Sequence, residues 1–137
     1  MSQAAIARVR TGYEAMSRGD WDAVLALWHP DIELKSTLFG TYVGHQDVRR
    51  AIEDQLRPFE EVVLEPFEFF ERGDQIAVFV LIRYRLRGTS VTPPEVRIGT
   101  VWTMRDGKAI RCETFPRREQ ALEALELPKQ QDAHADS

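Results

Sequence analysis

The chain has 137 residues, of which 43% are hydrophobic and 29% are charged, and this balance is typical of one folded globular domain. Its formal net charge is −4 and its basic residues form no tract, which argues against a nucleic acid as partner. The single cysteine, Cys112, excludes an intrachain disulfide and is compatible with a reducing compartment.

The sequence contains no segment that we expect to enter a membrane. Its first ten residues lack the apolar stretch of a signal peptide. The longest apolar run, from Ile76 to Ile82, is far shorter than the ~20 residues that cross a bilayer. We therefore expect a cytoplasmic protein that has no membrane partner.

The first half of the chain has the pattern of three helices around one strand. Apolar residues recur at three- and four-residue spacing in the first segment, which Gly19 ends. Asp20 is suited to cap the next helix, and Pro30 to end it. The expected elements are a helix over residues 4–17, a helix from Asp20 with Trp28 on its buried face, a strand over 32–36, a loop with Gly40 and Gly44, and a helix over 45–56.

The second half of the chain is mostly strand. The segment over residues 75–87 starts with apolar residues on both faces, so we expect it in the centre of the sheet. Asp106-Gly107 is a favoured two-residue hairpin turn. The expected elements are strands over residues 62–70, 75–87, 95–105 and 108–115, and a helix over 117–127.

This order of elements predicts a single α+β domain over residues 1–127, followed by a disordered polar tail over residues 128–137. The mostly antiparallel sheet is expected to curve into a cone. Three N-terminal helices would pack in its hollow beside a C-terminal helix, and a conical cavity would remain between them.

Several segments have the order and spacing of a known family. They are Tyr13-Glu-Ala-Met-Ser-Arg-Gly-Asp-Trp-Asp22, His29-Pro-Asp-Ile-Glu33, Tyr42-Val-Gly-His45, Val101-Trp-Thr-Met-Arg-Asp-Gly-Lys108 with Arg111 and Glu113, and residues 118–127. Together they resemble the SnoaL-like branch of the nuclear transport factor 2-like superfamily, which is related to polyketide cyclases and ketosteroid isomerases.

The resemblance implies a cystatin-like, nuclear transport factor 2-like fold and commonly a homodimer formed through the sheet. It does not imply one reaction, because such proteins include cyclases, isomerases, dehydratases, epoxide hydrolases and binders without catalysis. Ser36 falls where the ketosteroid isomerase has its carboxylate base, and Thr100 falls near its oxyanion-stabilising acid. A hydroxyl cannot replace a carboxylate that exchanges a proton near neutral pH, so steroid isomerisation is disfavoured.

The hairpin at Asp106-Gly107 predicts which residues share a face. Counting outward from a two-residue loop, Trp102 would face Arg111 and Thr100 would face Glu113. We interpret Glu113 as a candidate catalytic acid or base in the cavity, with Arg111 orienting an anionic oxygen. The alternative is that the two residues form a structural ion pair, or face solvent or a dimer partner. A register shift by one residue would move the whole set to the opposite face.

The candidate ligand-binding residues offer flat apolar surfaces, hydroxyls or guanidinium groups. Tyr42 is the preferred aromatic because it lies between glycines, whereas Tyr13 and Trp28 have the alternative of plain core packing. Arg83 has the alternative of a solvated strand end. The full candidate set is Tyr13, Trp28, Tyr42, Arg83, Thr100, Trp102, Arg111 and Phe115.

We expect no metal and no cofactor. The three histidines, His29, His45 and His134, are dispersed, and no glycine-rich phosphate loop is present. The first functional hypothesis is therefore a cofactor-independent acid/base enzyme, of cyclase, isomerase or dehydratase type, that acts on a small apolar molecule with a carbonyl group. The alternative is a binding or dimerisation module of the same fold. An ionisable residue in the cavity would favour the enzyme, an open apolar cavity the binder, and a cavity filled by Trp28, Trp102 and Phe115 the dimerisation module.

Overall fold

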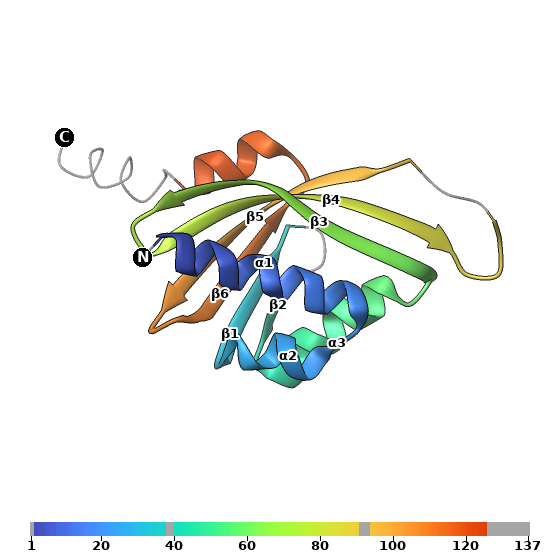
Figure 1. Cartoon of the computed structure of the whole chain (residues 1–137), viewed down its shortest axis with the longest axis horizontal. Helices are drawn as coiled ribbons and strands as arrows, with labels where there is room; N and C mark the ends of the chain where they lie inside the picture. The colour runs from blue at the N-terminus through green and yellow to red at the C-terminus, as the bar shows by residue number, and fades with distance from the viewer. Residues whose placement is uncertain (1, 38–39, 91–93, 126–137) are drawn as a thin grey trace.

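A computed structural model describes residues 2–37, 40–90 and 94–125 of the chain. The fold is α+β, with helices packed against one curved sheet (Figure 1). The elements are α1 (Ser2–Arg18), α2 (Trp21–Ala26), β1 (Trp28–Ser36), β2 (Gly40–Val43), α3 (His45–Leu56), β3 (Phe59–Arg72), β4 (Gln75–Leu86), β5 (Val96–Arg105) and β6 (Lys108–Phe115), followed by a helix over residues 118–125.

The start of α2 follows from its cap. The Asp20 carboxylate accepts a hydrogen bond from the Ala23 backbone N–H at 3.2 Å, which confirms Asp20 as the helix start. The helix ends at Ala26, so the prediction that it includes Trp28 was wrong. Trp28 is the first residue of β1 and pairs with Ala109 of β6. The backbone at Trp28 is therefore part of the sheet and not of the helix.

The six strands lie in the order β2-β1-β6-β5-β4-β3. The β1–β6 pair is parallel, and all other neighbours are antiparallel. The apolar segment over residues 75–87 was expected centrally in the sheet; β4 is an interior strand, but it lies next to the edge strand β3, and the central strands are β6 and β5. The loop expected around Tyr42 is a short edge strand instead: Tyr42 in β2 pairs with Leu34. A strand of four residues is too short to show a clear alternation of apolar and polar residues, so the sequence pattern did not predict it.

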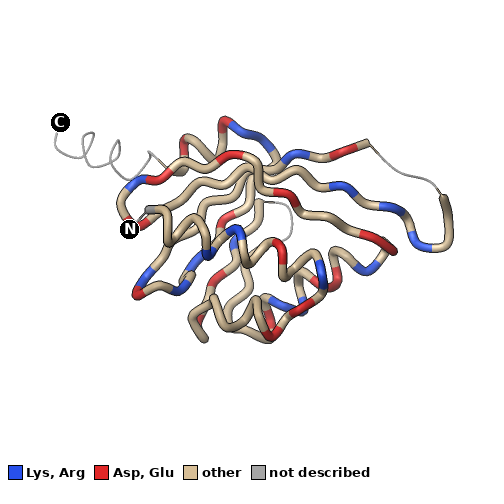
Figure 2. The backbone as a smooth tube through the Cα atoms, viewed as in Figure 1, with Lys and Arg blue, Asp and Glu red and all other residues tan. Residues whose placement is uncertain are grey.

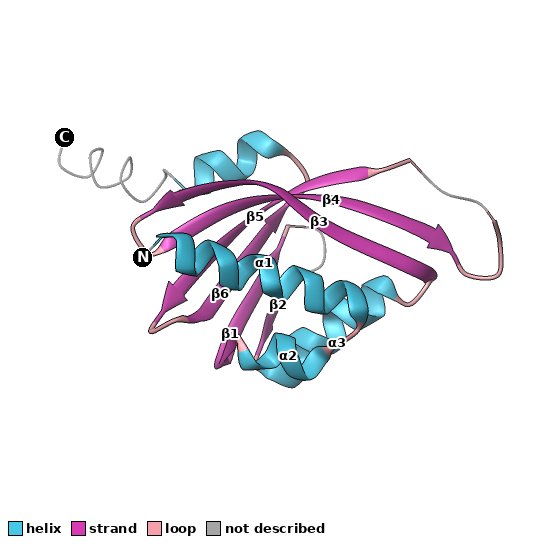
Figure 3. Ribbon diagram, in the orientation of Figure 1, coloured by secondary structure: helices cyan, strands magenta, loops and turns pink. Residues whose placement is uncertain are grey.

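The two faces of the sheet carry separate cores. The three labelled helices α1, α2 and α3 lie on the concave face, where the larger apolar cluster packs (Figures 1 and 3). The helix over residues 118–125 lies on the convex face and packs Ala121 and Leu125 against Ala77, Phe79 and Val101. The predicted C-terminal helix is confirmed over these residues, and the tail expected over residues 128–137 lies outside the described residues.

The β5–β6 hairpin contains a bulge that the sequence analysis did not predict. The Asp106-Gly107 turn pairs Arg105 with Lys108 and Met104 with Ala109, as expected. The register then shifts, and Ile110 is the extra residue. Beyond it, the paired positions are Thr103 with Arg111, Trp102 with Cys112, Val101 with Glu113 and Thr100 with Thr114.

This bulge reverses the side-chain alternation of β6. Cys112 and Thr114 share the concave face with Trp102 and Thr100. Arg111 and Glu113 therefore face the convex side, and the prediction that Glu113 points into the cavity was wrong. One additional residue is enough for this, because side chains in a strand alternate with a period of two.

Acidic and basic residues are interspersed along the described backbone (Figure 2). Many of them form ion pairs between neighbouring strands or along α3. None of the described helices is long and apolar enough to cross a bilayer.

Candidate functional site

An apolar cavity of about 120 Å³ lies between the concave face of the sheet and helices α1 and α3. We call it the inner chamber. Its walls include Met16 from α1, Val48 and Ile52 from α3, Ile32 from β1 and Val80 from β4. The helices pack across the curved sheet without filling its hollow, so the expected cavity is open and is not filled by the tryptophans.

Three polar side chains meet in the wall of the inner chamber. The Tyr13 hydroxyl oxygen lies 3.0 Å from the Thr100 hydroxyl oxygen. The Trp102 indole nitrogen lies 3.1 Å from each of these oxygens. The Thr100 hydroxyl donates to the Val78 carbonyl oxygen at 3.0 Å. All three side chains are buried, so their hydrogen bonds replace water that the fold has removed.

The donors in this network can be assigned from its chemistry. An indole N–H can only donate, and the Thr100 hydroxyl already donates its proton to the Val78 carbonyl oxygen. The Tyr13 hydroxyl therefore donates to Thr100 in the empty protein. Trp102 also reaches Thr100, so the Tyr13 proton can turn to a bound molecule while the Thr100 oxygen keeps a donor. Tyr13 is thus the adaptable donor of the chamber.

Neither of the two titratable groups in the inner chamber ionises near neutral pH. Burial raises the pKa of Tyr13 well above its ordinary range, and the neighbouring Cys112 adds to this effect. Burial also raises the pKa of the Cys112 thiol, with a smaller contribution from Glu113. Tyr13 is therefore a neutral hydrogen-bond donor, and Cys112 is a neutral thiol with little nucleophilic character.

In the part of the chain that the structure describes, no carboxylate, imidazole, amine or guanidinium lines the inner chamber. Acid/base catalysis needs a group that exchanges a proton near the working pH, and neither Tyr13 nor Cys112 meets this requirement. The chamber can enclose an apolar molecule and donate a hydrogen bond to it.

A second hollow of about 260 Å³ adjoins the inner chamber, and we call it the outer chamber. Its own walls include Val96 and Phe115, and it shares several wall residues with the inner chamber. The shared residues are Ser36, Gln55, Ile82, Ile98 and Thr114. The two chambers therefore adjoin one another at these five residues.

The structure brings about half of the predicted site residues to these chambers. Tyr13, Trp28, Thr100 and Trp102 line the inner chamber, and Phe115 lines the outer chamber. The remaining candidates, Tyr42, Arg83, Arg111 and Glu113, line neither chamber.

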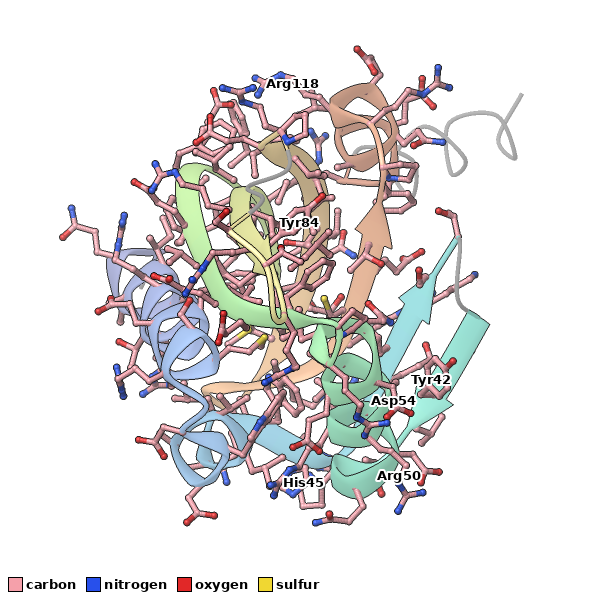
Figure 4. The ribbon with its side chains drawn as sticks, turned by 90° about the vertical axis from the view of Figure 1, so that its right-hand side faces the viewer. Tyr42, His45, Arg50, Asp54, Tyr84 and Arg118 are labelled. Atoms are coloured by element: carbon pink, nitrogen blue, oxygen red, sulfur yellow. The ribbon has the colours of Figure 1, made fainter. Side chains whose placement is uncertain are left out.

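Tyr42 lies beside an open groove of about 540 Å³ between β2 and α3. Figure 4 shows it close to Arg50 and Asp54 of α3 at one end of the molecule. The charged side chains here are exposed: Arg50 pairs with Asp47 of the same helix, and Asp54 pairs with Arg57, which follows the end of the helix. An open groove with exposed ion pairs excludes little water, so we place the candidate site in the chambers.

Glu113 and Arg111 form the structural ion pair that was the alternative interpretation. Arg111 lies 3.3 Å from the Glu113 carboxylate and 3.2 Å from the Glu33 carboxylate of the adjacent strand. The side chain of Glu113 is 21% exposed on the convex face. The bulge at Ile110 is the reason that neither residue reaches the cavity.

Arg83 also lies on the convex face, and the expectation that it reaches the cavity mouth was wrong. It continues the face of Phe79, which packs under the C-terminal helix, whereas Val78 and Val80 face the helices of the concave side. Arg83 lies 2.7 Å from both the Glu65 and the Glu95 carboxylates. It is an exposed ion-pairing residue at the end of a strand.

The sequence analysis missed Gln55 and Cys112 as wall residues. Gln55 follows Val48 and Ile52 at helical spacing, so the stripe of α3 that faces the sheet could have identified it. Cys112 could not be found in this way, because its orientation depends on the bulge.

The two histidines within the described residues have structural contacts, and His134 lies outside those residues. The His45 Nε2 atom lies 2.9 Å from the Trp28 carbonyl oxygen, and His29 Nδ1 accepts a hydrogen bond from the Asp31 backbone. Among the residues that the structure describes, no three histidine, cysteine or acidic side chains are grouped as a metal site.

Comparison with known proteins gives a consistent family. The family model described as SnoaL-like domain matches residues 9–112. No curated protein matches the chain in a sequence search.

Three solved structures illustrate the range of similarity. TerC, co-crystallised with polyporic acid, is 30% identical, with a TM-score of 0.72 over 89% of this chain and 97% of TerC. A nuclear transport factor 2-like protein from Burkholderia pseudomallei K96243 is 26% identical, with a TM-score of 0.72 over 89% of this chain and 96% of that one. A protein with a ketosteroid isomerase-like fold from Catenulispora acidiphila DSM 44928, in complex with trimethylamine, is 14% identical, with a TM-score of 0.70 over 86% of this chain and 91% of that one.

Proposed function

The chain belongs to the SnoaL-like domain family, and from this premise we propose that its inner chamber binds a small, uncharged, largely apolar molecule through the hydroxyl of Tyr13. The observation that carries this proposal is the buried Tyr13–Thr100–Trp102 network in a mostly apolar wall, whose other polar residues lie where the two chambers adjoin. The network offers one proton that can be redirected to a ligand oxygen.

The volume of the chamber limits the buried part of the ligand. A cavity of about 150 Å³ in another protein binds benzene, so a chamber of about 120 Å³ suits one small ring. Apolar surface moved out of water contributes about 25 cal/mol per Å², which favours an apolar ring here. A charged group would lose its hydration with no counter-ion in the described walls, so the buried end is uncharged.

The ligand oxygen is an acceptor, for example of a ketone or a quinone. Tyr13 stays protonated and can only donate its proton or accept from Trp102. A carbonyl oxygen has two lone pairs and needs a donor when it is buried. Tyr13 therefore offers the hydrogen-bond donor that a ligand with a carbonyl group, as expected from the sequence, would need.

A binding role is better supported than acid/base catalysis. Glu113, the candidate catalytic residue, lies on the convex face, and the described chamber walls hold no substitute for it. TerC, at 30% identity, was co-crystallised with polyporic acid, which supports small-molecule binding by this fold. We therefore propose the non-catalytic binding module over the enzyme.

Isothermal titration with acetophenone and isopropylbenzene tests this proposal. The two probes have similar shape, but only acetophenone carries an acceptor oxygen. We expect Tyr13→Phe to weaken acetophenone binding about three- to tenfold and to leave isopropylbenzene unchanged. Tyr84→Phe is the matched control, because the Tyr84 ring packs at a tilt against Phe59 and lines neither chamber (Figure 4). Equal losses for both probes, or no loss, would refute a donor role for Tyr13.

The homodimer implied by the family and a cytoplasmic location also remain proposals. The part of the convex face near Glu33 and Arg111 is a suitable contact surface, since these side chains are 38% and 40% exposed. Light scattering on the purified protein would test the dimer, and a monomer at all concentrations would contradict it.

A further inference from the structure

The junction between the two chambers differs chemically from the chambers themselves. Ser36 from β1, Gln55 from α3 and Thr114 from β6 line both chambers, together with the apolar Ile82 and Ile98. We call the three polar residues the collar. Mostly apolar walls lie on both sides of it, with Val48 and Ile52 inward and Val96 and Phe115 outward; Thr37 is a further polar residue of the outer chamber. A molecule that occupied both chambers would therefore pass apolar, polar and apolar surroundings in turn.

Two members of the collar have unused hydrogen-bonding capacity. The amide of Gln55 and the hydroxyl of Thr114 make no hydrogen bond to any other residue in the described ranges. An amide offers two donor hydrogens and an acceptor oxygen, and a hydroxyl offers one donor hydrogen and two lone pairs. Gln55 also borders the open groove between β2 and α3, so water can reach its amide in the empty protein.

Covering these groups with a purely apolar molecule would be unfavourable. Such a ligand would remove water from the Gln55 amide and the Thr114 hydroxyl without replacing its hydrogen bonds. A ligand with its own polar group at this level would restore them. No charged residue lines either chamber in the part of the chain that is described, so this polar group is neutral.

We propose, on the basis of the proposed binding function, that the ligand is an elongated neutral molecule with a hydrogen-bonding group in its middle. Gln55 and Thr114 form hydrogen bonds to this group. Its acceptor-bearing ring occupies the inner chamber against Tyr13. An apolar continuation occupies the outer chamber, whose volume of about 260 Å³ is larger than that of the inner one. Gln55 and Thr114 are then specificity-determining residues rather than parts of the core.

Two probes of equal length separate the contribution of the collar from that of the chambers. N-(para-acetylphenyl)butanamide carries an amide next to its ring, and para-pentylacetophenone carries methylenes in the same positions. Both keep the acetyl group for Tyr13 and a tail for the outer chamber. Gln55→Met and Thr114→Val remove hydrogen-bonding groups with little change in side-chain volume.

Titration of both probes into the wild type and the two variants gives a thermodynamic cycle. We expect each variant to weaken binding of the amide probe about three- to tenfold, and to leave the affinity for the pentyl probe unchanged or higher. Retained affinity for the pentyl probe also shows that the variants fold. If the amide probe loses no affinity relative to the pentyl probe, the collar does not read the ligand and the inference is wrong.

The two proposals fail in different ways. If acetophenone binds through Tyr13 but the cycle shows no coupling, the inner-chamber function stands and the collar proposal falls. If Tyr13→Phe has no effect on acetophenone, the proposed function itself falls, and the collar proposal falls with it.

Discussion

Gly99 of β5 and Ala121 of the helix over residues 118–125 are in direct contact on the convex face of the sheet. A Cβ atom on Gly99 would lie 2.6 Å from the Ala121 Cβ and 3.2 Å from the ring of Phe79. Carbon atoms do not pack this closely, so the helix can lie against the strand only because residue 99 has no side chain. Ala121 is fully buried by this contact.

We predict that Gly99→Ala lowers the free energy of unfolding by about 1–3 kcal/mol, because the helix must move away from the strand. Urea denaturation followed by circular dichroism measures this loss. The double variant Gly99→Ala/Ala121→Gly should recover part of it, limited by the cost of about 1 kcal/mol for glycine within a helix. Wild-type stability of the single variant would contradict the close packing.

The bulge at Ile110 determines which side chains of β6 reach the inner chamber. Trp102 and Cys112 are paired, and both contribute to the wall of the chamber. Deletion of Ile110 would join Ala109 directly to Arg111 and remove the bulge. The pairs Thr103–Arg111 and Trp102–Cys112 would keep their register, so Arg111 and Glu113 would stay on the convex face. We predict that the deletion variant folds with its chamber wall intact and loses no more than about 1–3 kcal/mol, comparable with a loss of about 1 kcal/mol for Ile110→Ala. Soluble yield and thermal unfolding measure both effects, and a deletion variant that fails to fold would contradict the assignment of Ile110 as the extra residue.

The elements that the sequence predicted well are those with a strong local signal. The helix over residues 45–56 and the strand over residues 108–115 have the predicted bounds, and Asp106 and Gly107 adopt the positive φ angles of 52° and 80° that suit their turn. Local periodicity and turn chemistry were sufficient for these elements.

The candidate site was harder to predict because it depends on contacts between distant segments. Tyr13 and Trp102 meet across the fold, and no local pattern links them. The bulge has no sequence signal either, since Arg-Cys-Glu-Thr over residues 111–114 alternates equally well in both registers. The sequence therefore identified the aromatic and hydroxyl groups of the chamber and placed Arg111 and Glu113 on the wrong face.

The buried thiol of Cys112 predicts how stability depends on pH. Burial raises its pKa in the folded state, so the unfolded chain releases this proton first, above about pH 8.5. The folded protein then binds more protons than the unfolded chain, and stability falls as the pH rises. We predict a loss of up to about 1.4 kcal/mol per pH unit from this group, to which Tyr13 adds above about pH 10.

Urea denaturation of the wild type and of Cys112→Ala between about pH 7 and pH 10 tests this prediction. The substitution leaves a cavity and lowers stability at every pH, so the comparison concerns the slopes. The variant should lose less stability with rising pH than the wild type. Parallel pH profiles would show that the thiol is not protected from ionisation in the folded state.

Glu113 provides the sharpest contrast between a catalytic and a structural interpretation. The carboxylate pairs with Arg111 on the convex face, and Arg111 also pairs with Glu33. We predict that Glu113→Gln leaves the affinity for acetophenone unchanged, because the carboxylate lies across the sheet from the inner chamber. The free energy of unfolding should change by less than about 1 kcal/mol, since Arg111 keeps its second partner and exposed ion pairs contribute little.

Isothermal titration measures the affinity for acetophenone, and urea denaturation measures the free energy of unfolding. Tyr13→Phe is the comparison variant, because it is expected to weaken acetophenone binding. A Glu113→Gln protein that binds acetophenone several times more weakly would place the carboxylate in contact with the chamber, and the structural assignment would have to be abandoned.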